Sequence, residues 1–188
     1  MLQEIFKVII NILKLNKNFF KDKKNFGKAS IYFAILLVLI GSIISIIPNS
    51  SFLVYMGSNL DLGVIQGPSL RIVIISSLIM WFIKTTYLFF AGTILFPDKK
   101  TNCDYRKILI LVAYCQVPLF LNVLVLTPSL LIFIFVTYIW YNVSLIIGLK
   151  ILFNYESYMK TALVSLAPQI IFLIYIMSVF QNNNITFS

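Results

Sequence analysis

One uncharged stretch decides the fold: residues 108–149 read ILILVAYCQVPLFLNVLVLTPSLLIFIFVTYIWYNVSLIIGL. These 42 residues contain no Lys, Arg, Asp or Glu. As one helix they would extend about 63 Å at 1.5 Å per residue, roughly twice the hydrocarbon thickness of a bilayer. The chain must therefore turn back once, and Thr127, Pro128 and Ser129 supply a turn signal. The stretch predicts two membrane-spanning helices, over 108–126 and 130–153.

The rest of the chain has the same character. It is 60% hydrophobic and 11% charged, whereas a soluble domain carries about 25% charged residues. Further uncharged runs predict a span over 29–47, a span between Arg71 and Asp98, and a span over 161–180. Residues 52–70 are interrupted by glycines and a proline, and they predict an outer loop. Because the runs lack the alternation of barrel strands, the predicted fold class is all-α: a polytopic transmembrane bundle of five helices.

The first 15 residues predict an amphipathic helix rather than a span. Apolar and polar side chains separate onto two faces at 3.6-residue spacing. Such a cationic helix can lie in the plane of the lipid headgroups; the alternative is a helix packed against the protein's own cytoplasmic loops. The predicted organisation is a cytoplasmic helix and basic connector over 1–28, a five-helix domain over 29–180, and a short outer tail over 181–188.

Charge asymmetry predicts the orientation. Of the 15 Lys and Arg residues, 13 fall on one side of the five predicted spans, and only Arg71 falls on the other. The positive-inside rule then places the N-terminus in the cytoplasm and the C-terminus outside. Anionic lipid headgroups are the expected counter-charge, and nucleic acid is not, because the basic residues flank apolar runs. The expected membrane-surface basic residues are Lys7, Lys14, Lys17, Lys21, Lys23, Lys24 and Lys28.

Four polar residues are predicted at one depth near mid-membrane: Lys84, Gln116, Asn142 and Gln169. Ionisable residues at this depth are candidates for function. We leave three interpretations open. The groups join helices by hydrogen bonds, or they form a path for a ligand, an ion or a lipid headgroup, or Lys84 lies nearer the inner surface and its side chain extends to it.

Prolines interrupt two of the predicted helices beside these amides. Pro118 follows Gln116 by two residues, and Pro168 directly precedes Gln169. A membrane proline most often makes a packed kink, but interrupted helices near the midplane can also line a binding site.

No catalytic chemistry is indicated. The chain has no His, and all six of its carboxylates lie outside the predicted spans. A Ser-His pair, an HExxH metal site and an intramembrane aspartyl pair are therefore excluded. We expect no catalytic residue, no metal and no cofactor.

The predicted third span resembles the Yip1 domain family. Residues 105–118, YRKILILVAYCQVP, are similar to a family pattern in which a small residue and a Tyr precede a Pro. The aromatic-rich fourth span with Trp140 and the last span with its proline continue the resemblance, which covers about residues 12–180. The resemblance implies five membrane helices, a cytoplasmic N-terminus and a short exposed C-terminus.

Eukaryotic Yip1 members associate with Rab-type small GTPases and act in vesicle traffic. Their Asp-Leu-Tyr-Gly-Pro motif and their long N-terminal region are missing here. We therefore expect a protein of the prokaryotic type, in a prokaryotic cell membrane, without a small GTPase as partner.

Taken together, these features predict a non-catalytic membrane scaffold, adaptor or membrane-organising protein. Its expected partners are the bilayer, anionic lipid headgroups, and other membrane proteins or a second copy of the chain. The alternative is a transporter or channel for a small solute, an ion or a lipid that uses the polar layer around Lys84.

Overall fold

The computed structural model describes residues 2–27, 29–46, 69–98, 101, 103–124 and 132–182. Within these ranges every regular element is a helix, which confirms the all-α class. The elements are α1 (Leu2–Leu13), α2 (Lys17–Lys21), η1 (Lys23–Phe26), α3 (Ala29–Ile44), α5 (Leu70–Phe90), η2 (Ala91–Leu95), α6 (Tyr105–Tyr114), η3 (Val117–Leu124), α7 (Ile132–Phe153) and α8 (Tyr158–Asn182).

Among the described residues, three helical segments are long and apolar enough to cross a membrane. They are Leu70–Leu95, Tyr105–Leu124 and Ile132–Phe153, and they coincide with the predicted second, third and fourth spans. The predicted first span corresponds to a shorter apolar helix, Ser30–Ile44. The predicted fifth span lies within α8, which is 25 residues long. A total of five crossings stays a prediction, and the predicted outer loop and turn lie largely outside the described residues.

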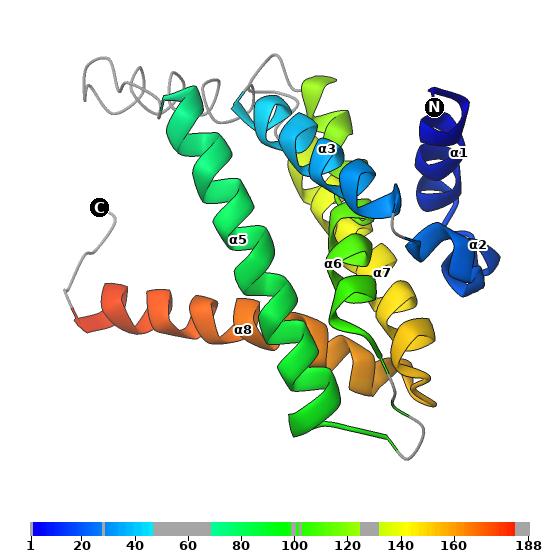
Figure 1. Cartoon of the computed structure of the whole chain (residues 1–188). Helices are drawn as coiled ribbons and strands as arrows, with labels where there is room; N and C mark the ends of the chain where they lie inside the picture. Colours follow the sequence, from blue (N-terminus) through cyan, green and yellow to red (C-terminus); the bar gives the residue numbers. More distant parts are fainter. Residues whose placement is uncertain are drawn as a thin grey trace.

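Helix α6 forms the centre of the bundle, with α3, α5 and α7 packed around it (Figure 1). Every side chain from Ile108 to Tyr114 is buried. A helix that is apolar on all sides reaches its lowest free energy when neighbours cover all of it. Trp81 of α5 fixes one of these contacts, because its indole nitrogen donates to the backbone oxygen of Leu109 at 3.0 Å.

The α-helix of the third apolar run ends shortly before Pro118. α6 ends at Tyr114, Cys115 and Gln116 form a turn, and the chain continues as the 3₁₀ helix η3. Proline has no N–H to continue the α-helical pattern and disfavours the α conformation in the residue before it. In α8, by contrast, the helix continues through Pro168.

Helix α1 is present where the sequence predicts a helix, and the structure adds a contact. α1 packs against α6 and η3, with the side chain of Ile12 fully buried. Phe6 and Ile10 stay exposed on the same helix. The placement of α1 among lipid headgroups stays a prediction, but part of its apolar face is already covered by the protein.

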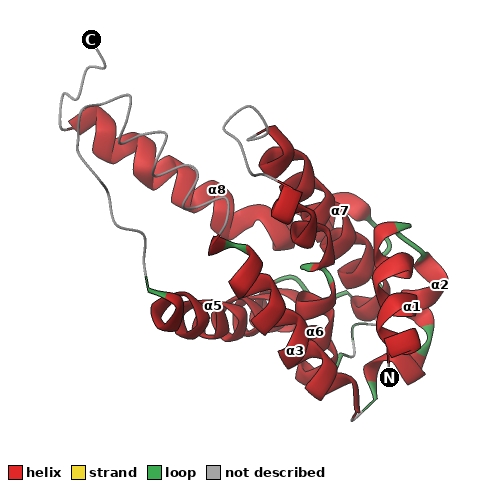
Figure 2. Cartoon of the chain, turned by 90° about the horizontal axis from the view of Figure 1, so that it is seen from above, coloured by secondary structure: helices red, strands yellow, loops and turns green. Residues whose placement is uncertain are grey.

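Helix α8 leaves the end of α7 and extends away from the other helices (Figures 1 and 2). Near its start, Lys160 forms an ion pair with Asp98 at 2.6 Å. The hydroxyl of Tyr155 donates to the backbone oxygens of Gly92 at 2.7 Å and Phe96 at 2.9 Å. These oxygens belong to the π-helix η2 and the residue after it, so the loop before α8 caps an irregular helix end.

Candidate functional site

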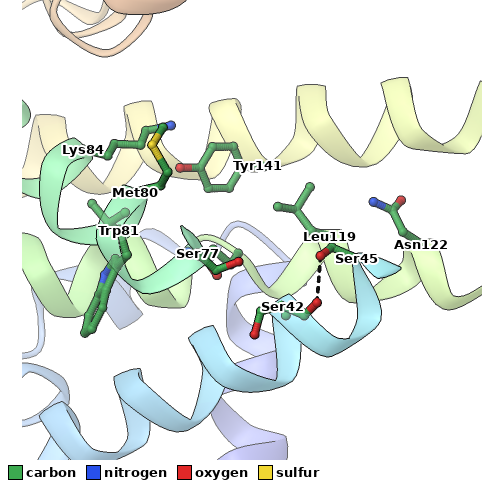
Figure 3. Close-up of a pocket in the computed structure, with 12 residues that line it drawn as sticks. Ser42, Ser45, Ser77, Met80, Trp81, Lys84, Leu119, Asn122 and Tyr141 are labelled. Atoms are coloured by element: carbon green, nitrogen blue, oxygen red, sulfur yellow. Dashed lines mark hydrogen bonds between the residues drawn. The ribbon is translucent and has the colours of Figure 1, made fainter. Parts of the chain in front are cut away.

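A cavity of about 280 Å³ lies between α3, α5, α6, η3 and α7. Its polar lining residues are Ser42, Ser45, Ser77, Lys84, Gln116 and Asn122 (Figure 3). The remaining lining is largely apolar and includes Met80, Trp81 and Leu119. The cavity therefore combines one cation with hydroxyl and amide groups inside an apolar wall.

Lys84 places its ammonium group over the ring of Tyr141, 4.4 Å from the ring centroid. Tyr141 belongs to α7 and is buried, whereas Lys84 is half-buried on α5. A cation at this distance from an aromatic face is stabilised by about 0.5–2 kcal/mol. Figure 3 shows the two side chains together at one end of the cavity.

The break between α6 and η3 borders the same cavity. Gln116, in the turn, projects toward α3, where its side-chain oxygen lies 3.2 Å from the position that a Cβ on Gly41 would occupy. A side chain larger than glycine at position 41 would push against Gln116. The turn before Pro118 thus places Gln116 in the cavity wall, and a binding role for this interruption stays a prediction.

The predicted single polar layer is divided into two groups. Lys84 and Gln116 line the cavity. Asn142 and Gln169 instead bond to each other: the Gln169 amide nitrogen donates to the Asn142 side-chain oxygen at 3.1 Å. This bond joins α7, which carries Asn142, to α8, which carries Gln169. The structure therefore brings Lys84 and Gln116 to the cavity and joins Asn142 to Gln169, while the common depth of the four residues stays a prediction.

Sequence reasoning also missed several cavity residues. Ser77 precedes Lys84 by seven residues and so lies on the same face of α5; that spacing was a usable signal. Tyr141 and Asn122 gave no such signal, because their position depends on how α7 and η3 pack. Asn122 accepts a hydrogen bond from Thr137 at 2.6 Å, which joins η3 to α7.

At the loop end of the bundle, electrostatics hold the connections in place. The hydrogen bond from Lys160 holds the pKa of Asp98 below its usual value. Burial, with a smaller contribution from Asp98, raises the pKa of Tyr155 to about 12, so its hydroxyl keeps the proton that it donates. Burial likewise raises the pKa of the Cys103 thiol to about 11.

The predicted surface lysines are distributed over α1, α2 and η1. Lys7, Lys14, Lys17, Lys21 and Lys24 are exposed. Lys17 shares the ring of Tyr158 with Lys150, at 5.7 Å and 3.8 Å from the centroid. The side chain of Lys23 and all of Lys28 lie outside the described residues. Across the described part of the chain, no group of three or more His, Cys, Asp or Glu side chains is placed to hold a metal ion.

A family model described as "Yip1 domain" matches residues 10–180. No curated protein and no solved structure matches the chain.

Proposed function

The chain belongs to the Yip1 domain family, and on this premise we propose that it is a non-catalytic scaffold or adaptor of a prokaryotic cell membrane. Its membership of this family and its long apolar helices indicate that it is a membrane protein. The proposed orientation has the N-terminus in the cytoplasm and the C-terminus outside, as the positive-inside rule favours. In this role the protein would bind partners through exposed cytoplasmic groups.

One observation carries the proposal: three polar side chains inside the bundle, on α5, α7 and α8, have partners on a neighbouring helix. Gln169 bonds to Asn142, Thr137 bonds to Asn122, and Lys84 lies against the ring of Tyr141. Interhelical hydrogen bonds contribute about 0.6–2 kcal/mol each to helix association, and a cation–π contact contributes about 0.5–2 kcal/mol. These three contacts therefore support the structure of the bundle, as a scaffold requires.

The exposed lysines of the N-terminal segment provide the complementary feature. We call Lys7, Lys14, Lys21 and Lys24 the basic surface; all four are exposed. Lys21 also borders a hollow of about 260 Å³. Lys107 and apolar residues of α2, η1 and α7, among them Phe20, also line this hollow. A basic surface with apolar groups beside it is suited to an acidic partner segment.

The test is a partner-capture experiment with matched variants. Replacing the basic surface by Gln at all four positions should remove most membrane-protein partners captured from host membranes by the full-length protein. Arg71→Gln is the control, because Arg71 is an exposed base at the start of α5, on the predicted outer side. Deleting α1 is a poorer variant, because it would also uncover the contacts of Ile12. An unchanged partner set in the four-lysine variant would argue against the proposal.

Transport is the second candidate, and the cavity beside Lys84 is the observation in its favour. The two functions differ in how Lys84→Met should act. If the protein is a scaffold, the Lys84→Met variant should stay folded and keep its partners. If it is a transporter, the same variant should change the flux of ions or lipids across reconstituted vesicles, compared with a measurable wild-type flux. If wild-type vesicles pass no solute above the protein-free level, transport loses its support.

A further inference from the structure

We propose that the cavity beside Lys84 binds an anionic single-chain amphiphile, with its head at the Lys84 ammonium and the start of its chain inside the cavity. The head is a carboxylate or a phosphate; both supply negative charge and hydrogen-bond acceptors. This binding goes beyond the scaffold function and does not depend on it.

The first argument is charge. Lys84 lies 14 residues after the first residue of α5, about 21 Å along the helix axis and so well inside the hydrocarbon layer. Among the described residues, Lys160–Asp98 is the one ion pair, and it lies at the loop end of the bundle. The carboxylates whose side chains are described lie in connections: Asp22, Asp98, Asp104 and Glu156. Among the described side chains, Lys84 thus has an aromatic neighbour but no carboxylate to balance its charge, and an anion beside it would be strongly favoured.

The second argument is the kind of groups that share the cavity. The Ser77 hydroxyl and the Gln116 amide face the same space as Lys84, and both can donate hydrogen bonds to an oxyanion. Ser42 and Ser45 donate instead to backbone oxygens of their own helix, Leu39 and Ser42, at 2.8 Å each. The cavity therefore offers hydrogen-bond donors for an anionic head in addition to the Lys84 ammonium, while Leu119 and Val112 offer apolar wall for a chain.

The third argument is size and access. The volume of about 280 Å³ holds about nine non-hydrogen atoms, if each takes the roughly 30 Å³ of a water molecule. That is enough for a carboxylate and several carbons, but not for a diacyl lipid. The cavity reaches the molecular surface at Met80, whose side chain is 60% exposed. In a membrane this face of α5 meets acyl chains, so the rest of an amphiphile's chain can remain among the lipids.

Trp81 provides a local probe of occupancy. It lines the cavity and is 3% exposed, so quenchers dissolved in the surrounding detergent do not reach it. The only other tryptophan of the chain is Trp140, whose indole nitrogen is buried without a hydrogen-bond partner among the described residues. Trp140→Phe removes this competing signal and an unsatisfied N–H, and so should preserve the fold.

The experiment titrates the full-length Trp140→Phe protein with decanoate brominated at mid-chain, because bromine quenches indole fluorescence on contact. Parallel titrations use decyl phosphate and decanol brominated at the same position. We expect either charged amphiphile to quench Trp81 at a concentration at least about tenfold lower than decanol. The tighter of the two charged compounds identifies the head that the site prefers.

Substitutions at Lys84 complete the test. Lys84→Met should raise the half-quenching concentration of the charged amphiphile about tenfold, and Lys84→Arg should restore most of the affinity. Equal quenching by decanoate, decyl phosphate and decanol would overturn the proposal. An unchanged titration in a folded Lys84→Met protein would do the same. If Lys84→Met does not fold, the comparison of charged and uncharged amphiphiles on the Lys84 protein still decides. These titrations measure equilibrium binding, so their outcome is separate from partner capture and from flux.

Discussion

Packing around Gly92 makes a sharp prediction about stability. The ring of Phe153, which has no solvent exposure, lies directly over Gly92, and a Cβ at position 92 would overlap three of its atoms. Overpacking a core costs about 1–3 kcal/mol. The cost here should be near 3 kcal/mol, because the buried Phe153 ring has little room to move. Replacing Gly by Ala in a helix returns about 1 kcal/mol. Gly92→Ala should therefore destabilise the protein by about 2 kcal/mol, or about 4–8 °C in thermal midpoint for a chain of this size.

Gly41→Ala is the matched control for this prediction. A Cβ at position 41 would lie 3.2 Å from the mobile end of Gln116 and from the edge of the Phe120 ring, so small adjustments suffice and the midpoint should change little. The midpoints can be measured by heating the detergent-solubilised protein and following the folded peak by size-exclusion chromatography. Combining Gly92→Ala with Phe153→Leu should recover part of the loss, since the smaller side chain yields space. A Gly92→Ala protein as stable as the wild type would refute the packing described here.

Three further predictions concern contacts of α8 and the loop before it. Tyr155→Phe removes the donor to two backbone oxygens of the η2 region and should lower stability by about 1–2 kcal/mol in the same thermal assay; an unchanged midpoint would contradict the capping role. Gln169→Leu leaves the Asn142 side-chain oxygen without its 3.1 Å partner and should cost about 0.6–2 kcal/mol, whereas a stabilised variant would show that this bond is unimportant. Lys160 lowers the pKa of Asp98, so the ion pair stabilises the folded protein above the unfolded pKa of about 3.9, and this stabilisation is lost as the pH falls through the lower folded pKa. In Asp98→Asn the thermal midpoint should therefore vary less with pH at the acidic end. A pH profile identical to that of the wild type would contradict the ion pair.

The lengths of the uncharged runs predicted the three long apolar helices of the described residues well. Residues 108–149 had to fold back, because their length exceeds one membrane thickness. The structure has α6 and η3 before residues 125–131 and α7 after them, and η3 and α7 pack against each other. The interruption at Pro118 was also predictable, since it follows from the missing N–H of proline. Both features depend on properties of neighbouring residues, so they can be predicted without knowing how the helices pack.

Polar residues were harder to place, for a physical reason. Depth along a helix can be counted, but the direction of a side chain depends on how the helix is rotated against its neighbours. Asn142 and Tyr141 are adjacent in the sequence, yet Tyr141 lines the cavity and Asn142 bonds to α8. The contact of α1 with α6 and η3 is likewise tertiary: its amphipathic pattern predicts an apolar partner but does not say which.

Topology is the central claim, and cysteine labelling tests it most directly. In a background lacking Cys103 and Cys115, one variant carries Ser188→Cys and another carries Thr101→Cys, in the connection between η2 and α6. With five crossings, a membrane-impermeant maleimide should label position 188 in intact cells, and it should label position 101 only after the membrane is opened. If the two positions share the same accessibility, the number of crossings or the orientation is wrong, and the basic surface does not face the cytoplasmic partners proposed here.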